Sequence, residues 1–364
     1  MKEKIKIIHI IDSLSIGGSE SVAVNIINSL PSQRFEKFLC ATRNGGPLSQ
    51  KLNEDIEYIE IHRKSTFDLK ALIKLAIFIK EKNILLIHAH SSSLFISILI
   101  KTITRSRKVI WHDHYGLSDD NDRSVIIYRF LLSYVDYVVS VNHKLSEWVT
   151  NVIGVNPNKN QVLPNFIIKR DEVAINRLPG EKNSRIICVA NFRPQKDHIT
   201  LIKAMRIICN KLPNSHLILI GKKIDVEYSS YLIQEIDKLK LSKNITCLES
   251  VDNVQPYLKQ CDVGVLSSKS EGLPLSLLEY GLMSLSVVVT NVGQCAEVVE
   301  YGDAGILIEP QNPELLAQGI IFLLENESIR NDFAVKFHNV VIKKYSSQAV
   351  IPEILNIYEK VLTQ

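Results

Sequence analysis

The sequence predicts an α/β protein built from two doubly wound parallel sheets. Short apolar runs rich in β-branched residues alternate with longer amphipathic patterns through most of the chain. This alternation is typical of parallel strands that helices cover on both faces. It stops once, near the middle, and then restarts. Because 364 residues also exceed what one hydrophobic core usually serves, we expect two domains of similar size.

The elements of the first half follow one another in a strand–helix order. Continuous apolar runs predict strands at residues 5–11, 37–43, 84–90, 108–112 and 137–142. Helical patterns occur at residues 19–30, 67–82 and 143–153. Sheets of this kind bind ligands at the carboxyl ends of their strands, so the loops that follow strands are where function is expected.

The periodic pattern is lost over residues 156–184, which are rich in Asn, Pro and charged residues, and we interpret them as a linker. Strand patterns return at residues 185–192, 216–221, 245–250, 261–268, 284–291 and 304–310, with a helix at 198–212. A last helix at 351–362 places on one face Ile351, Ile354, Leu355, Tyr358 and Leu362. We therefore assign domains to residues 1–168 and 169–345, and expect residues 346–364 to form a helix that packs back on the first domain.

Composition excludes several classes of protein. The net charge of +4 suits an anionic ligand or an acidic membrane surface, and it is too small to indicate nucleic-acid binding. The six cysteines occur singly, so we interpret them as reduced packing residues of a reducing compartment. The N-terminus has a strand pattern rather than that of a signal peptide, and no apolar run is long enough to span a bilayer. We expect a cytoplasmic protein, at most associated with the inner face of the cell membrane.

The stretch "SEGLPLSLLEYGL" surrounds a predicted helix start with polar residues. Pro274 suits the first turn of a helix. Glu271 and Gly272 then lie in a strand-to-helix loop, and the amides of Leu275 and Ser276 are free at the helix start. Such a helix start binds anions, phosphate especially.

Two carboxylates flank this helix start. If Glu271 and Glu279 were both helical they would stand roughly 12 Å apart, which exceeds the spacing of about 5 to 9.5 Å in a hydrolase carboxylate pair. They can instead hold two hydroxyl-rich ends of one ligand, such as a sugar and a ribose. The plainer interpretation, a helix-capping acid and a solvated helix residue, stays open at this point.

Two other strand ends carry residues suited to phosphate. Arg193 and Lys196 follow the strand at 185–192, and two cations three residues apart can clamp a diphosphate. Gly17 and Gly18 follow the first strand and permit close backbone approach at a helix start.

Together these motifs resemble those of retaining glycosyltransferases of family 4, which have the GT-B fold. "GGSE", "RPQKD", "EGLPLSLLE" and "VGQCAEVVEYGDAGILIEP" stand in that family's order, and the resemblance covers nearly the whole chain. It implies that Glu271 contacts the donor sugar, that Glu279 contacts the ribose, and that Arg193 and Lys196 neutralise the diphosphate. It also implies a donor-binding set that includes Gly17, Gly18, Gly272, Leu273, Pro274, Leu275 and Ser276.

The loop "WHDHYG" follows the strand at 108–112. Members of the family usually carry a histidine after this strand, facing the donor sugar. Alignment by the strand end favours His114, while His112 stays open as the alternative. His90, which also follows a strand, is a weaker acceptor-side candidate, and we interpret His88 as half-buried packing.

Two patterns could suggest a metal, and we expect none. The His-x-His of "WHDHYG" offers only two ligands and has no cysteine beside it. The Asp-x-Asp in "SDDND" (residues 118–122) precedes a helical pattern, so we interpret it as an N-cap and loop. Arg193, Lys196 and a helix dipole suffice to stabilise a leaving diphosphate.

The resemblance therefore predicts a retaining, metal-independent glycosyltransferase with no cofactor. Its substrates would be a nucleotide sugar, UDP- or GDP-linked, and a hydroxyl of a glycan or lipid-linked acceptor in bacterial surface polysaccharide or glycoconjugate synthesis. Basic and apolar residues combine at 67–82 and 94–108, which allows peripheral membrane contact. The alternatives are a sugar-nucleotide 2-epimerase of the same architecture and a non-catalytic sugar-nucleotide-binding subunit.

Overall fold

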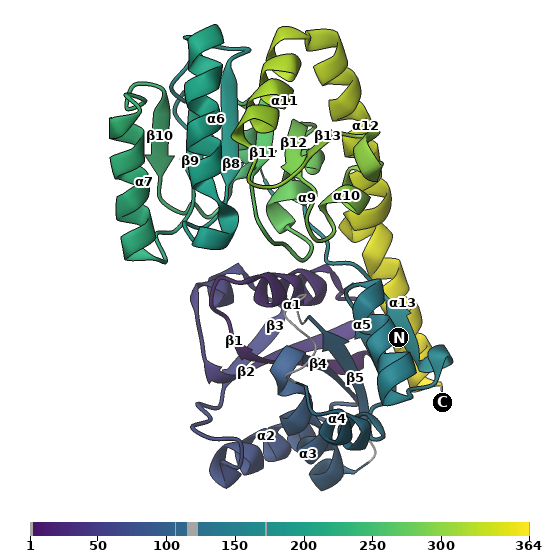
Figure 1. The fold of residues 1–364 in the computed structure, drawn as a ribbon. Helices are drawn as coiled ribbons and strands as arrows, with labels where there is room; N and C mark the ends of the chain where they lie inside the picture. Colours follow the sequence, from purple (N-terminus) through teal and green to yellow (C-terminus); the bar gives the residue numbers. More distant parts are fainter. Residues whose placement is uncertain (1–2, 106, 115–122, 172, 364) are drawn as a thin grey trace. The chain divides into compact units, whose positions relative to one another are not determined.

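The computed structural model describes residues 3–105, 107–114, 123–171 and 173–363. It divides the chain into two compact units, one formed by residues 1–166 with 347–364 and the other by residues 167–346. Each unit contains a parallel sheet with helices on both faces (Figure 1). The predicted α/β class with two doubly wound sheets is therefore confirmed. The "SDDND" motif lies outside the described residues.

The first unit has a seven-stranded sheet in the order β3-β2-β1-β4-β5-β6-β7. Its strands are β1 (Ile5–Ser13), β2 (Phe35–Asn44), β3 (Ile56–Glu60), β4 (Leu86–His90), β5 (Lys108–Asp113), β6 (Tyr137–Ser140) and β7 (Asn160–Val162). The sequence pattern missed the two edge strands, β3 and β7, and β7 lies inside the stretch interpreted as linker. Both are short and at most half buried over most of their length, so neither has the continuous apolar run of a central strand.

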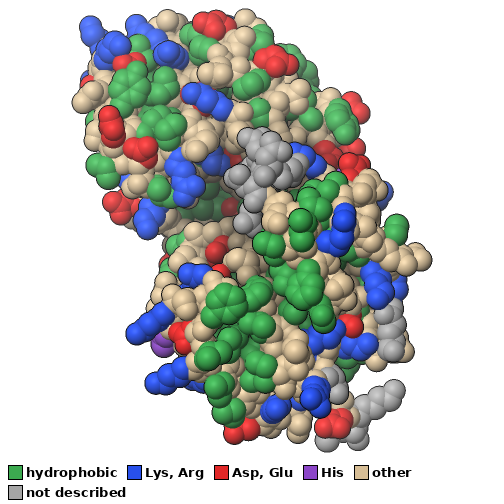
Figure 2. Space-filling model, turned by 60° about the horizontal axis from the view of Figure 1, so that its bottom comes forward, with side chains coloured by type: hydrophobic (Ala, Val, Ile, Leu, Met, Phe, Trp, Pro, Cys, Tyr) green, Lys and Arg blue, Asp and Glu red, His purple; other side chains and the backbone are tan. Residues whose placement is uncertain are grey.

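Helices cover both faces of this sheet. On one face lie α1 (Gly18–Ser29) and α13 (Ser347–Leu362), and on the other lie α2 (Leu69–Glu81), α3 (Leu94–Thr104) and α4 (Val125–Leu132) (Figure 1). After β6 the chain forms α5 (His143–Glu147), which continues as a π-helical turn. Figure 2 shows hydrophobic side chains gathered on the outer surface of this unit, with lysines and arginines around them.

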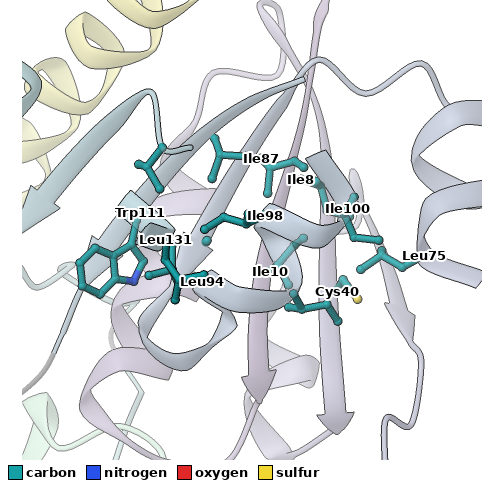
Figure 3. Close-up of a cluster of buried hydrophobic side chains, with 14 of the residues drawn as sticks. Ile8, Ile10, Cys40, Leu75, Ile87, Leu94, Ile98, Ile100, Trp111 and Leu131 are labelled. Atoms are coloured by element: carbon teal, nitrogen blue, oxygen red, sulfur yellow. The ribbon is translucent and has the colours of Figure 1, made fainter. Parts of the chain in front are cut away.

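A hydrophobic core fills the space between the sheet and the helices α2, α3 and α4. Figure 3 shows strand residues of this core next to helix residues, namely Ile8, Ile10, Ile87 and Trp111 with Leu75, Leu94, Ile98 and Leu131. All of these side chains are at most 7% exposed. The opposite face of the same central strands carries histidines, so the two faces of the sheet differ sharply in polarity.

The last helix, α13, belongs to the first unit, as predicted for a helix that packs back. Ile351, Ile354 and Tyr358 are buried on its inner face as expected, whereas Leu355 and Leu362 are only half buried. Their places are taken by other apolar residues of the helix, Val350, Ile357 and Val361. An ion pair of 2.6 Å between Arg34 and Glu359 joins α13 to the start of β2.

The second unit has a six-stranded sheet in the order β10-β9-β8-β11-β12-β13. Its strands are β8 (Arg185–Val189), β9 (His216–Ile220), β10 (Ile245–Leu248), β11 (Val263–Leu266), β12 (Ser286–Thr290) and β13 (Ile306–Ile308). One face packs on α6 (His198–Lys211), α7 (Val226–Lys238) and α11 (Pro313–Glu325), and the other on α9 (Leu275–Leu282), α10 (Cys295–Val298) and α12 (Glu327–Tyr345). The short helix α8 (Gln255–Leu258) precedes β11.

Both sheets reverse their strand order beside their first strand. In the first unit the reversal falls between β1 and β4, and in the second between β8 and β11. Ligands of doubly wound sheets bind at such a switch point, outside the carboxyl ends of the strands. Among the described residues, no helix is both long enough and apolar enough to cross a membrane.

Candidate active site

The switch point of the second unit brings Lys196 and Glu271 together. Lys196 ends the short 3-10 helix that follows β8, and Glu271 lies in the loop between β11 and α9. The Nζ atom of Lys196 lies 2.6 Å from Oε1 of Glu271, and the hydroxyl of Ser268 donates a 2.6 Å hydrogen bond to the same oxygen. The Glu271 side chain is 7% exposed. A buried carboxylate held by one cation and one hydroxyl has a fixed position.

Hydrogen bonds tie the loops around this pair to one another. The Ser267 hydroxyl donates to the backbone oxygen of Lys196 at 3.0 Å, which joins the loop after β11 to the loop after β8. The Thr290 hydroxyl donates to the backbone oxygen of Ser268 at 2.7 Å, which adds the end of β12. Three neighbouring strand ends therefore support one site.

Gly293, in the loop after β12, packs directly against the backbone of Glu271. A side chain at Gly293 would collide with the Glu271 carbonyl oxygen, and its φ of +55° is one that other residues rarely adopt. The amide of the next residue, Gln294, donates to the carbonyl oxygen of Gly272 at 3.0 Å. A glycine is thus required at Gly293 for close contact between the two loops.

The start of α9 faces the same edge of the sheet. The helix begins at Leu275, one residue later than predicted, so Pro274 is its N-cap rather than part of its first turn. The N-cap residue, Pro274, makes no side-chain capping bond, so the amides of Leu275 and Ser276 have no partner within the helix. Glu279, four residues after Leu275 and half buried, has its side chain on the same face of the helix as that of Leu275.

Arg193 stands apart from this group. It precedes the 3-10 helix that contains Lys196, and its side chain is exposed. Over the described residue ranges, no ion pair or side-chain hydrogen bond joins it to Lys196 or Glu271. The structure therefore brings together one of the two predicted cations and the first glutamate.

In the first unit, Gly17 and Gly18 lie at the start of α1, as the motif predicts. The carboxylate of Glu20 folds back over Gly17, so closely that a Cβ there would collide with it. Ser19 donates a 2.8 Å hydrogen bond to this carboxylate. An anion at this helix start would have to displace Glu20.

The predicted histidines lie together at the switch point of the first unit. His90 ends β4, His112 lies in β5, and His114 follows β5 directly. The distance from Nδ1 of His90 to Nε2 of His114 is 3.0 Å, and the ring of His112 stacks on that of His114 with centroids 4.0 Å apart. Burial lowers the pKa of His114 to about 3, so its ring is neutral near pH 7. His88 is fully rather than half buried.

Two triplets of imidazoles have ligand atoms within 4.8 Å of one another: His90 with His112 and His114, and His90 with His9 and His88. The sequence shows two histidine ligands in the loop after β5, and a count of two is wrong because the fold adds a third imidazole, His90, from β4. Both nitrogens of His90 already lie 3.0 Å from a nitrogen of another imidazole. A cation at either triplet would have to break these contacts, so the absence of a metal stays our prediction.

Sequence reasoning missed Asp12, which lies near the end of β1 at the same switch point. Its carboxylate accepts hydrogen bonds from Thr42 and Ser92 and forms a 2.9 Å ion pair with Arg63. Burial alone would raise the pKa of Asp12, but these hydrogen bonds and the charge of Arg63 outweigh it and lower the pKa. The sequence feature that could have identified Asp12 is a carboxylate at the end of an apolar strand.

The chain matches two family models that follow one another along its length. The model described as Glycosyltransferase Family 4 matches residues 16–169, and the model described as Glycosyl transferases group 1 matches residues 169–337. An N-acetyl-alpha-D-glucosaminyl L-malate synthase of Bacillus anthracis is 26% identical, with 96% of this chain and 95% of the relative covered. A UDP-Gal:alpha-D-GlcNAc-diphosphoundecaprenol alpha-1,3-galactosyltransferase of Escherichia coli is 23% identical, with 98% and 97% covered.

Solved structures show the same fold. A glycosyltransferase from Rickettsia africae superimposes with a TM-score of 0.81 at 18% identity, and the match covers 99% of each chain. Anabaena Alr3699/HepE, solved in complex with UDP and glucose, superimposes with a TM-score of 0.79 at 18% identity, covering 98% of this chain and 100% of that one. With two consecutive family models and full-length relatives of one activity class, the chain belongs to the family 4 glycosyltransferases of the GT-B fold.

Proposed function

We propose that the protein transfers a sugar from a UDP- or GDP-linked donor to a hydroxyl of a glycan or lipid-linked acceptor, with retention of configuration and without a metal ion. The observation that carries this proposal is the Lys196–Glu271 pair beside the uncapped start of α9. It combines a cation and free backbone amides, suited to a diphosphate, with a carboxylate suited to sugar hydroxyls.

Each part of the donor would have its own partner in the second unit. Lys196, the exposed Arg193 and the amides of Leu275 and Ser276 would neutralise the charge that develops on the leaving diphosphate. Glu271 would accept hydrogen bonds from the sugar. Glu279, about one turn into α9, would accept them from the ribose hydroxyls.

The names of the relatives support the substrate classes. The Escherichia coli relative is named for a UDP-galactose donor and a diphosphoundecaprenol-linked acceptor. A Staphylococcus aureus relative, 27% identical, is named a capsular polysaccharide biosynthesis glycosyltransferase. These names favour a role in bacterial polysaccharide or glycoconjugate synthesis.

Retention would follow from a front-face route. Glu271 is already held by Lys196 and Ser268, which suits it to binding the sugar rather than attacking it. The bond between the anomeric carbon and the phosphate oxygen would break as the acceptor oxygen forms its new bond on the same face. The leaving phosphate oxygen would take the acceptor's proton. His114, which is neutral, would orient the sugar by hydrogen bonding without adding a fixed charge.

The outer surface of the first unit suits contact with a membrane that carries the acceptor. Phe67, Ile73, Ile77, Ile126 and Phe130 are each at least 50% exposed, and they lie on or beside α2 and α4. Exposed lysines of α2, at Lys70, Lys74 and Lys80, lie on the same helix as two of them. Apolar side chains with adjacent lysines are typical of surfaces that bind anionic lipid headgroups.

A panel of UDP-, GDP- and ADP-sugars tests the proposal. Thermal shift should identify one nucleotide class, and NMR of the product formed with a simple alcohol acceptor should show the donor's anomeric configuration retained. Inversion would contradict the front-face route, and an epimerised donor without transfer would favour the epimerase. A lack of stabilisation by every nucleotide sugar would overturn the donor site.

A further inference from the structure

Five histidines line one face of the first sheet. His9 lies on β1, His88 and His90 lie on β4, His112 lies on β5, and His114 follows it. The strand register pairs His9 with His88 and His90 with His112, and residues two apart on a strand point to the same face. The four within strands are at most 2% exposed. Because a buried polar group is costly unless it is hydrogen-bonded, these rings require an explanation beyond packing.

Four of these rings form one hydrogen-bonded chain with Tyr358 of α13. Nε2 of His114 lies 3.0 Å from Nδ1 of His90, and Nε2 of His90 lies 3.0 Å from Nδ1 of His9. Nε2 of His9 lies 3.2 Å from the Tyr358 hydroxyl, which lies 2.6 Å from Nδ1 of His88. All of these residues belong to the first unit, so its internal geometry alone defines the chain.

The positions of the protons along this hydrogen-bonded chain of rings are coupled, because the rings are neutral. Burial lowers the pKa of all four rings, to about 3 for His9 and His114. A neutral imidazole has one nitrogen that donates and one that accepts. The tautomer of each ring therefore decides that of the next. The Tyr358 hydroxyl has one hydrogen to donate, and only two arrangements satisfy every contact and also pair that hydrogen. Either all four rings are protonated on Nδ1, or all four are protonated on Nε2.

Both ends of the chain favour protonation on Nδ1. At the inner end, Nε2 of His88 is buried and has no partner within the described part of the chain, and a buried N–H without an acceptor is rarer than an unused lone pair. At the outer end, the side chain of Asn165 interacts with the ring of His114 and opposes the lowering of its pKa by burial. Nδ1 of His114 and Oδ1 of Asn165 are both buried, and neither has a hydrogen-bond partner of good geometry among the described residues, so they are the two atoms left to pair. A carboxamide oxygen can only accept, which favours a proton on Nδ1 of His114.

We propose that Tyr358 is a positioning residue: through His9 and His90, its hydroxyl holds His114 as the tautomer that carries its proton on Nδ1. The inference rests on the proposed function only for the role of His114 at the sugar. In this tautomer Nδ1 carries an N–H, which a sugar hydroxyl would accept in place of Asn165. In the other it offers a lone pair at the same position, and a wrong histidine tautomer can cost a histidine-dependent enzyme orders of magnitude in rate.

The variant Tyr358→Phe tests this, because it removes the hydroxyl and keeps the ring that packs on Phe35. Long-range ¹⁵N NMR of histidine-labelled full-length protein distinguishes protonated from unprotonated ring nitrogens and needs no ligand. We expect the wild type to show His9, His90 and His114 protonated on Nδ1. Tyr358→Phe should give mixed tautomers at all three rings. Release of UDP from UDP-glucose should fall at least tenfold in kcat, with the KM for UDP-glucose unchanged.

Two changes at His88 provide a second route if Tyr358→Phe is poorly folded. In His88→Asn, the side-chain amide can replace the Nδ1–H that His88 donates to Tyr358, so the tautomers should stay as in the wild type. His88→Leu removes that donor and should give a mixture. Tyr345→Phe, at a buried tyrosine of the second unit, is the matched control for losing a buried hydroxyl and should change no tautomer.

The two readouts separate the coupling of ring tautomers through Tyr358, which we call the relay, from the proposed reaction. Unchanged tautomers in both Tyr358→Phe and His88→Leu would overturn the relay, whatever the rate. A changed tautomer at His114 with unchanged UDP release would support the relay and contradict the role of His114 in transfer. Protonation of the rings on Nε2 in the wild type would contradict the tautomer that His88 and His114, at the two ends of the hydrogen-bonded chain, favour.

Discussion

Lowering the pH from 7.5 to 5.5 is expected to unfold the first unit before the second. The first unit buries His9, His88, His90, His112 and the ring of His114, and burial lowers the pKa of each from the ordinary value of 6.5. For His9 and His114 it falls to about 3. Below pH 6.5 the unfolded chain therefore binds more protons than the folded one, and stability must fall as the pH falls.

The size of the effect follows from the number of buried rings. A ring that stays neutral when folded and titrates at 6.5 when unfolded loses about 1.4 kcal/mol of folding stability at pH 5.5. Five such rings lose about 7 kcal/mol together, which is comparable with the roughly 5–15 kcal/mol that stabilises a typical domain. The second unit has two histidines with lowered pKa values, His198 and His216, so its loss is smaller.

Tryptophan fluorescence can follow the first unit alone. The chain has two tryptophans, and both Trp111 and Trp148 are buried in the first unit. Urea titrations at several pH values then give its free energy of unfolding. The slope of this free energy against pH should correspond to an uptake of about 4.5 protons at pH 5.5.

His112→Leu is a matched control for this experiment. Neither ring nitrogen of His112 has a hydrogen-bond partner among the residues that the structure describes, so leucine should change the stability at pH 7.5 by less than about 1 kcal/mol. It should lower the proton uptake by about one. A wild-type uptake of two protons or fewer would mean that the cluster already holds protons when folded, and the description of five neutral rings would be refuted.

Four further predictions concern the reaction. Lys196→Ala should lower turnover by about 10²-fold or more while leaving the melting temperature of the second unit within a few degrees, and full turnover in this variant would exclude Lys196 from the donor site. Glu271→Gln should spare binding of UDP and reduce transfer, whereas Glu279→Ala should weaken binding of UDP; equal UDP affinities by calorimetry would contradict this division. His114→Ala should lower turnover strongly and leave the affinity for UDP unchanged, because the nucleotide is proposed to bind the other unit. EDTA should leave turnover unchanged, and inhibition that Mg²⁺ or Mn²⁺ reverses would contradict a metal-free reaction.

The type and order of most elements could be predicted from the sequence, because they depend on local periodicity. The apolar run at 84–90 became β4, and the amphipathic pattern at 67–82 became α2. A loop before the helix of "EGLPLSLLE" was also predictable, since proline at a helix start and glycine before it act locally. Edge strands such as β7 were not, because three half-buried residues carry no pattern of their own.

The contacts that make the candidate sites depend on how distant segments pair. Glu271 meets Lys196 across 75 residues because β8 and β11 are neighbours in the sheet, and no local signal states that pairing. The sequence by itself determined that polar residues follow the strands, since each motif shows its own glutamate, lysine or histidine. Only the tertiary structure decided that His9, His90 and His114 share one face and that Tyr358, 270 residues after His88, closes their chain. The physical reason is that side-chain direction is local to a strand, whereas strand register and helix docking are set by the packing of the whole sheet.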